Sequence, residues 1–166
     1  MRFGWLTLAH SPGADQDHAA IGHQLEQACL ADTLGFDGVW LTEHNFTGEA
    51  VYSDPIPFAS ALAMRTTRVR IGFAVIQLAL RHPVRLAVQL ALLDNLCGGR
   101  LDVGVGRGSI YNEYEFVGYG LRSDDARERA TAYQPAETTP RGHAASGPCA
   151  RQSDGRPPSP SPSCPR

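Results

Sequence analysis

The chain has 166 residues, enough for one ordinary domain, and 42% of them are hydrophobic, which is sufficient for a core. Its formal net charge is −2, so no basic surface indicates a nucleic-acid partner. The amino-terminal stretch is too short and mixed for a signal peptide, and no apolar run approaches a membrane span, so we expect a cytoplasmic protein.

The cysteines show no spacing typical of a metal site. Cys29, Cys97, Cys149 and Cys164 form neither a CxxC pair nor a Cys/His set, and we expect no metal. Cys29 and Cys97 fall within helical apolar patterns, where a buried free thiol is the simplest interpretation.

Apolar strand patterns and amphipathic helix patterns alternate along the first 129 residues. Strands are predicted over 3–9, 38–41, 69–78 and 101–105. The βαβαβαβ order with short connections predicts an α/β fold with parallel strands and right-handed crossovers.

The helices between these strands carry recognisable ends. Asp15 or Asp17 can cap the first helix, and Gly35 closes it in the left-handed conformation. Asp54 and Pro55 form an N-cap and first helical residue for the second. The third, from 83 to about 96, has leucines on more than one face, so it is either deeply buried or packed on a partner subunit. The inward positions are predicted to be Ile21, Leu25, Ala28 and Cys29 in the first helix and Ile56, Ala59, Leu62 and Ala63 in the second.

Polar residues follow the predicted strands at their carboxyl ends. Parallel strands bring these ends to one edge of a sheet, where α/β proteins place their active sites. We therefore expect His10, Glu43 with His44, residues 74–77 and residues 106–109 to converge.

Residues 130–166 differ in character from the rest of the chain. They contain no Leu, Ile, Val, Phe, Met or Trp and hold eight of the twelve prolines, so they cannot bury enough apolar surface to order, and we expect a disordered tail. Residues 124–129 begin like an amphipathic helix that then dissolves. We advance the hypothesis that the reading frame shifts near 128–133; the alternative is a genuine disordered tail.

Three short motifs carry possible chemistry. His44 suits general acid/base work and Glu43 could hold it or contact a ligand, whereas the structural alternative is a loop histidine. Gly104-x-Gly106-Arg107-Gly108 could let backbone N–H groups and one guanidinium bind a phosphate, or could be a tight turn with a solvated Arg107. Ala74-Val75-Ile76 could be simple core, which the sequence favours, or a flat platform for an aromatic ring.

The run from 111 to 116, with alternating aromatic and acidic residues, has two interpretations. It could line the mouth of a site. An ordinary helical turn with a solvated face is the interpretation that the sequence favours.

Taken together, these residues resemble the bacterial luciferase-like, flavin-dependent monooxygenase family. The resemblance covers about residues 1–129. It rests on GFDGVWLTEHNF (35–46), SDP (53–55), the stretch from 66 to 100 and GVGRG (104–108), in that order and spacing.

The resemblance implies a (β/α)8 barrel that uses reduced FMN and O2 to oxygenate a small organic substrate. It implies that His44 is the catalytic histidine and that Glu43 lies at the cofactor. Ala74 and Val75 would form a platform under the flavin ring, joined by a non-prolyl cis peptide bond. Gly106 would lie beside the ring and Arg107 would contact the phosphate. Relatives dimerise through the helices after strands two and three, which implies a homo- or heterodimer.

The chain departs from the family pattern in two respects. Asn45 stands where a second histidine is common, and a neutral amide cannot shuttle a proton. A barrel of this type takes roughly 250 residues, so we expect only its N-terminal half, with unpaired edge strands and low or no activity.

Other functions stay open. A deazaflavin-dependent hydride transferase could use the same barrel, although EHNF favours the flavin group. A non-catalytic flavin-binding or partner subunit is a second alternative, and an interaction module with a Pro-rich ligand tail is a third.

Overall fold

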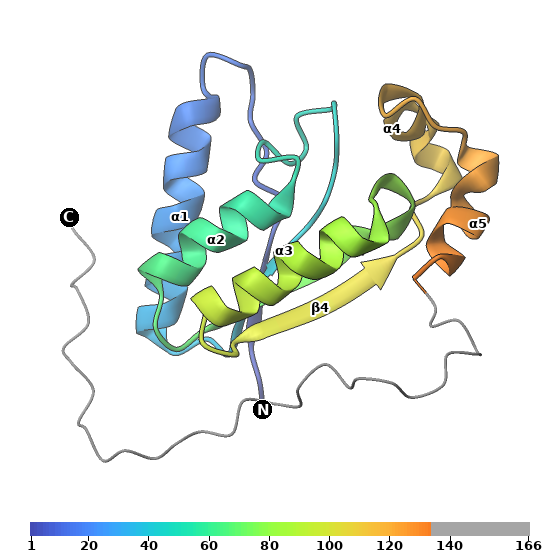
Figure 1. Ribbon diagram of the computed structural model, residues 1–166. Helices are drawn as coiled ribbons and strands as arrows, with labels where there is room; N and C mark the ends of the chain where they lie inside the picture. The colour runs from blue at the N-terminus through green and yellow to red at the C-terminus, as the bar shows by residue number, and fades with distance from the viewer. Residues whose placement is uncertain (134–166) are drawn as a thin grey trace, which may run out of the picture.

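The computed structural model describes residues 1–133, which form a parallel sheet with helices between its strands (Figure 1). The predicted disordered tail and frame shift fall mainly on residues 134–166, which lie outside the described residues. The elements are β1 (Gly4–Thr7), α1 (Asp17–Leu34), β2 (Gly38–Leu41), α2 (Pro55–Arg65), β3 (Arg70–Gln77), η1 (Leu78–Leu80), α3 (Pro83–Leu96), β4 (Leu101–Gly106), η2 (Ile110–Asn112), α4 (Glu113–Gly118), η3 (Ser123–Asp125) and α5 (Ala126–Thr131).

The four strands lie in sequence order, β1-β2-β3-β4, and every neighbouring pair is parallel. This confirms the predicted α/β class and strand direction. The register of β3 against β4 shifts between Phe73 and Ile76, where β3 carries one residue more than β4. This bulge contains Ala74 and Val75, so the strand end is irregular at the predicted platform.

Helices α1, α2 and α3 cover one face of the sheet, and α4 and α5 lie beyond the carboxyl end of β4 (Figure 1). The main core lies between these helices and the helix-side residues of the strands. In α2 the predicted inward residues Ile56, Ala59, Leu62 and Ala63 are all buried. In α1 only Ala28 of the predicted set is fully buried, and Ile21, Leu25 and Cys29 are half-buried.

The predicted helix ends are confirmed at two of three places. Gly35 has φ 85° and closes α1, and the Asp54 side chain accepts a hydrogen bond from Ile56 N at 3.0 Å. Neither Asp15 nor Asp17 caps α1, because Gln16 holds the N-cap position without a side-chain bond and Asp17 is already helical. Cys97 is buried as predicted, whereas Cys29 is only partly so.

The first strand is shorter than its apolar run, whereas β4 ends one residue later than expected, at Gly106. β1 was expected over 3–9 but pairs only over Gly4–Thr7, and Ala9 turns the chain with φ 50°. At the other end, α5 runs two residues past the expected boundary at 129, and Tyr133 packs against the core. Whether the chain divides into a barrel part and a tail stays a prediction.

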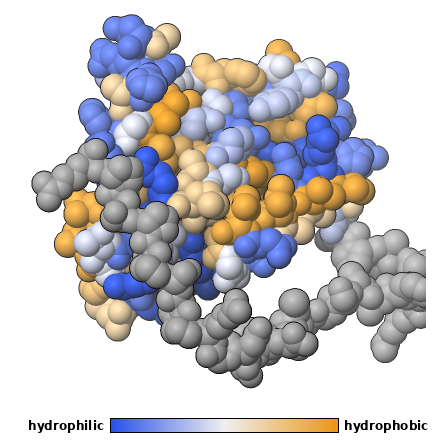
Figure 2. Space-filling view, turned by 60° about the vertical axis from the view of Figure 1, so that its left-hand side comes forward, coloured by the Kyte–Doolittle hydropathy of each residue, from blue (hydrophilic) through white to orange (hydrophobic). Residues whose placement is uncertain are grey.

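Apolar side chains reach the surface at both edges of the sheet. Leu6 of β1 is 54% exposed, and Val103 and Val105 of β4 are 41% and 52% exposed although they pair with the buried Phe73 and Ile76. Among residues 1–133 no further strand pairs with β1 or β4. Figure 2 shows hydrophobic residues exposed on one side of the molecule. The described part thus leaves strand edges and apolar surface uncovered.

No helix within residues 1–133 combines the length and the apolar character that crossing a bilayer requires.

Candidate functional site

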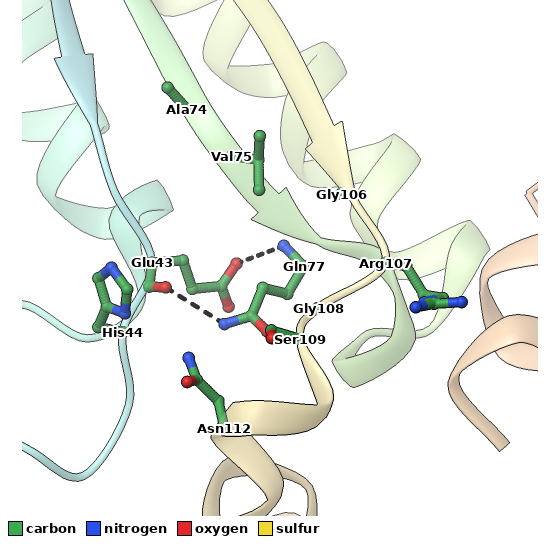
Figure 3. A pocket seen from close by; sticks show the side chains of 10 residues that line it. All are labelled: Glu43, His44, Ala74, Val75, Gln77, Gly106, Arg107, Gly108, Ser109 and Asn112. Atoms are coloured by element: carbon green, nitrogen blue, oxygen red, sulfur yellow. Dashed lines mark hydrogen bonds between the residues drawn. The ribbon is translucent and has the colours of Figure 1, made fainter. Parts of the chain in front are cut away.

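One pocket of about 370 Å³ opens at the carboxyl ends of β2, β3 and β4 (Figure 3). Three of the four strand ends therefore converge as predicted. His10 does not join them: it lines a separate hollow over α1, because the chain turns away after β1. The residues around the pocket are Glu43, His44, Ala74, Val75, Gln77, Gly106, Arg107, Gly108, Ser109 and Asn112.

Ala74 and Val75 form an exposed apolar shelf in this pocket. The peptide bond between them is cis, as the family resemblance implied. Both residues are exposed, so the core interpretation is wrong for them and correct only for Ile76, which is fully buried. Gly106 faces the shelf: a Cβ there would lie 2.7 Å from Val75 Cγ2, so only glycine lets the two strands approach this closely.

Glu43 follows β2 and is 4% exposed. Its Oε1 accepts from Arg81 Nη2 at 2.7 Å, and its Oε2 accepts from Gln77 N at 2.8 Å. Arg81 also reaches Asp54 Oδ1 at 3.0 Å, which ties the strand end to the cap of α2. The interpretation that Glu43 holds His44 is therefore wrong, since its carboxylate is bound by other groups.

Burial raises the pKa of Glu43, and the attraction of Arg81 offsets this only in part. For Arg81 burial acts to lower the pKa, but Glu43 and Asp54 outweigh it and the pKa is raised. The pair is thus a buried ion pair whose acidic member carries a desolvation cost.

His44 lies at one side of the pocket with its side chain 29% exposed. Its Nδ1 is 3.6 Å from Glu49 Oε2, so Glu49 is the carboxylate that faces the ring. This contact could not be predicted from the sequence, because Glu49 belongs to an irregular loop. An imidazole between a carboxylate and a pocket can donate a hydrogen bond or exchange a proton there.

The residue after His44 is turned away from the pocket. Asn45 is 1% exposed, and its Oδ1 accepts from Tyr119 OH at 3.0 Å. Its backbone N donates to Glu115 Oε1 at 2.7 Å. The Asn45 amide therefore supports the loop and does not occupy the place of a second pocket-facing group.

Gln77, which belongs to the predicted 74–77 stretch, lines the pocket, and Glu115, which sequence reasoning missed, is hydrogen-bonded to it. Gln77 is 4% exposed and Glu115 is 0% exposed, and Gln77 Nε2 donates to Glu115 Oε2 at 2.7 Å. The solvated-face interpretation of the 111–116 run is wrong for Glu115 and for the buried Phe116. Only the apolar Phe116 next to it could have indicated that this turn packs inward.

Arg107 lies at the side of the pocket opposite His44, as Figure 3 shows. Its side chain is exposed and has no hydrogen bond or ion pair within the part of the chain that the structure describes. The next residue, Gly108, has φ 93°, and a Cβ there would lie 2.8 Å from Gln77 Oε1. Gly106 and Gly108 thus flank Arg107 where the chain leaves β4 at the border of the pocket.

The arrangement has the chemistry of a cofactor site. A flat apolar shelf lies between an imidazole and a guanidinium, which suits a planar ring with an anionic group. Within residues 1–133 no group of three or more His, Cys, Asp or Glu side chains could hold a metal ion. Fold and pocket together define a partial (β/α) barrel with a site at the carboxyl edge of its sheet.

Comparison with known proteins gives the family. The model of the luciferase-like monooxygenase family matches residues 1–133, and the chain belongs to that family. It is 35% identical over 125 residues to 4-hydroxyprotoasukamycin monooxygenase of Streptomyces nodosus subsp. asukaensis, covering 75% of this chain and 33% of that protein.

Solved structures agree with this assignment. Monooxygenase RslO1 of Streptomyces bottropensis superposes with a TM-score of 0.71 at 37% identity, covering 78% of this chain and 39% of that one. The oxygenating constituent of 3,6-diketocamphane monooxygenase of Pseudomonas putida, solved with FMN, superposes with a TM-score of 0.68 over 78% of this chain and 38% of its own. At 21% identity this second likeness shows the fold alone. The chain spans between a third and two fifths of these relatives.

Proposed function

We propose that this chain carries the cofactor pocket of a flavin-dependent monooxygenase, which uses reduced FMN and O2 to oxygenate a small organic substrate. The observation that supports this most is that all six residues expected at the flavin border one pocket: Glu43, His44, Ala74, Val75, Gly106 and Arg107.

The pocket residues fit FMN. The Ala74–Val75 shelf offers an apolar surface to the ring, and Gly106 leaves room beside it because it has no side chain. Arg107, which has no partner among the described residues, would bind the phosphate. Glu43 would border the cofactor while its oxygens stay bound to Arg81 and Gln77.

Bound reduced FMN would supply the electrons that activate O2. His44 would be the catalytic residue, donating a hydrogen bond or moving a proton at the reacting face of the pocket, with the Glu49 carboxylate 3.6 Å from Nδ1. Asn45 cannot share this role, because its amide is buried against Tyr119.

The chain on its own should have low or no activity. The pocket is open, and oxygenation needs a site from which water is excluded. Leu6, Val103 and Val105 lie exposed at the sheet edges, where a closed barrel would cover them. Substrate identity would depend on residues that complete the barrel.

Titration of FMN fluorescence with the purified chain tests the cofactor assignment. Arg107→Ala should weaken binding at least about tenfold, corresponding to about 1.4 kcal/mol, and His44→Ala should leave affinity within about threefold. Arg122→Ala is the matched control, since Arg122 is 77% exposed and pairs with Asp124 outside the pocket. Absence of FMN binding, or an Arg107→Ala variant that binds equally well, would refute the proposal.

A deazaflavin cofactor is the alternative on the same barrel. It would donate a hydride without O2. Anaerobic turnover with a reduced deazaflavin, and no oxygen consumption with reduced FMN, would favour that alternative.

A partner-subunit role has a separate observation in its favour. The outer face of α3 carries an apolar stripe at every fourth residue: Val84, Val88, Leu92 and Leu96 are 66%, 64%, 61% and 42% exposed. A stripe of this spacing suits a helix-packing interface. We therefore include dimerisation through α2 and α3 in the proposal. Sedimentation of Val88→Glu should show dissociation, whereas an unchanged dimer would exclude this interface.

A further inference from the structure

Glu115 of α4 is a fully buried carboxylate with two neutral donors and no cation. It is 0% exposed; Oε1 accepts from Asn45 N and Oε2 accepts from Gln77 Nε2, both at 2.7 Å. None of the ion pairs within residues 1–133 includes it. Burying a carboxylate costs free energy unless its oxygens are hydrogen-bonded. The burial of Glu115 therefore suggests that it has a specific role.

The hydrogen bonds of Glu115 and Gln77 hold the backbone on both sides of His44. Gln77 Nε2 donates not only to Glu115 but also to the Glu43 carbonyl at 3.2 Å. The Glu43 carbonyl belongs to the peptide group before His44, and the Asn45 N–H belongs to the peptide group after it. The hydrogen bonds to the Glu43 carbonyl and from the Asn45 N–H therefore fix the two peptide groups that flank the His44 Cα, from which its side chain projects.

The Glu115–Gln77 pair also fixes the direction of the Gln77 amide. Nε2 faces two acceptors, the Glu43 carbonyl and the Glu115 carboxylate, so nitrogen must occupy that end. Oε1 is then directed toward Gly108, where a Cβ would meet it at 2.8 Å. One carboxylate thus orders groups that follow β2 and that end β3.

We propose that Glu115 is a positioning residue that, together with Gln77, sets the backbone of His44 and hence the direction of its imidazole in the pocket. This rests on the proposed function for the meaning of the pocket, but the positioning itself is a property of the chain. A carboxylate suits this position because both of its oxygens accept hydrogen bonds, one from Asn45 N and one from Gln77 Nε2. A glutamine there would present an N–H₂ group to one of two donors.

The test compares Glu115→Gln with Glu113→Gln. Glu113 lies on the same helix but is exposed, which makes it a matched control. Two quantities are measured for each folded variant: the His44 imidazole chemical shifts by ¹H–¹³C NMR, assigned with His44→Gln, and the FMN dissociation constant.

In Glu115→Gln we expect displaced His44 signals with FMN affinity within about threefold of the parent chain, as for His44→Ala, while Glu113→Gln matches the parent chain in both. A purely structural role would lower the melting temperature without changing the His44 signals in the folded protein. Unchanged His44 signals in folded Glu115→Gln would overturn the inference. If the His44 signals are displaced in Glu115→Gln but the parent chain binds no FMN, the positioning role is supported and the proposed function is refuted.

Gln77→Met provides a second route if Glu115→Gln does not fold. It removes the donor to both the Glu43 carbonyl and Glu115 and preserves side-chain length. The same displacement of the His44 signals is expected, and unchanged signals would overturn the inference equally.

Discussion

Replacing Arg81 with methionine should strongly destabilise the pocket end of the fold. Arg81 Nη2 lies 2.7 Å from Glu43 Oε1, and the two side chains are 12% and 1% exposed. Removing one member of a buried ion pair costs about 3–5 kcal/mol, because the other charge stays buried without its partner. Since Gln77 N still donates to Glu43, we expect a loss of about 3 kcal/mol in the free energy of unfolding.

This loss should depend on pH. Burial already raises the pKa of Glu43, and Arg81 opposes that effect, so Arg81→Met should raise the pKa further. A carboxyl whose folded pKa exceeds its unfolded pKa stabilises the fold below the unfolded value, and that contribution is lost as pH rises through the folded pKa. The destabilisation should therefore be smaller at pH 5 than at pH 8.

Urea unfolding followed by circular dichroism at both pH values measures this difference. Arg81→Met/Glu43→Gln should recover part of the stability at pH 8, since no unpaired carboxylate remains there. Arg122→Met is the control, because Arg122 and Asp124 are each 77% exposed and water screens such a pair. An equal loss at pH 5 and pH 8, or a double variant no more stable than the single one at pH 8, would refute the reasoning.

Two further predictions concern the sheet. Burial acts to raise the pKa of Asp32, but bonds from the backbone N–H groups of residues 67–69 outweigh it and the pKa is lowered. Asp32→Ala should cost about 1 kcal/mol at pH 7, because water can reach most of the freed N–H groups, and less as pH falls through the lowered pKa. Thermal melts giving equal losses at pH 3 and pH 7 would contradict this. Gly72→Ala would place a Cβ 2.6 Å from Trp40 Cζ3, so the indole must move, at a cost of about 1–3 kcal/mol and with a changed tryptophan emission spectrum. Gly22→Ala, with nothing within 4 Å, should leave the spectrum unchanged, and a Gly72→Ala variant that matches it would show that the ring is not held there.

Local signals explain what could be predicted from the sequence. Gly35 ends a helix because of its own backbone freedom, and Asp54 begins one because its side chain reaches the amide two residues on. Strand alternation with helices then determines the parallel order, and parallel order places Glu43, residues 74–77 and Gly106 at one edge of the sheet. None of these steps needs knowledge of distant contacts.

The missed features depend on distant contacts. Glu115 is separated by 70 residues from Asn45, its partner, and in the sequence only the neighbouring Phe116 indicates that this turn packs inward. His10 was expected at the pocket because it follows an apolar run. The 3–9 segment pairs with β2 only as far as Thr7, because β2 is only four residues long.

The two buried acids change how the electrostatics of the pocket should be understood. Glu43 lines the pocket, and Glu115 lies behind it, hydrogen-bonded to Gln77. In the structure their oxygens are bound from within the protein, by Arg81, Gln77 and the Asn45 amide. The ionisable side chains left to face a ligand are His44 and Arg107, and Arg107 has no acidic partner among the described residues. A pocket that binds its acids internally and leaves the Arg107 guanidinium without an acidic partner suits an anionic group, such as the phosphate of the FMN that we propose as its cofactor.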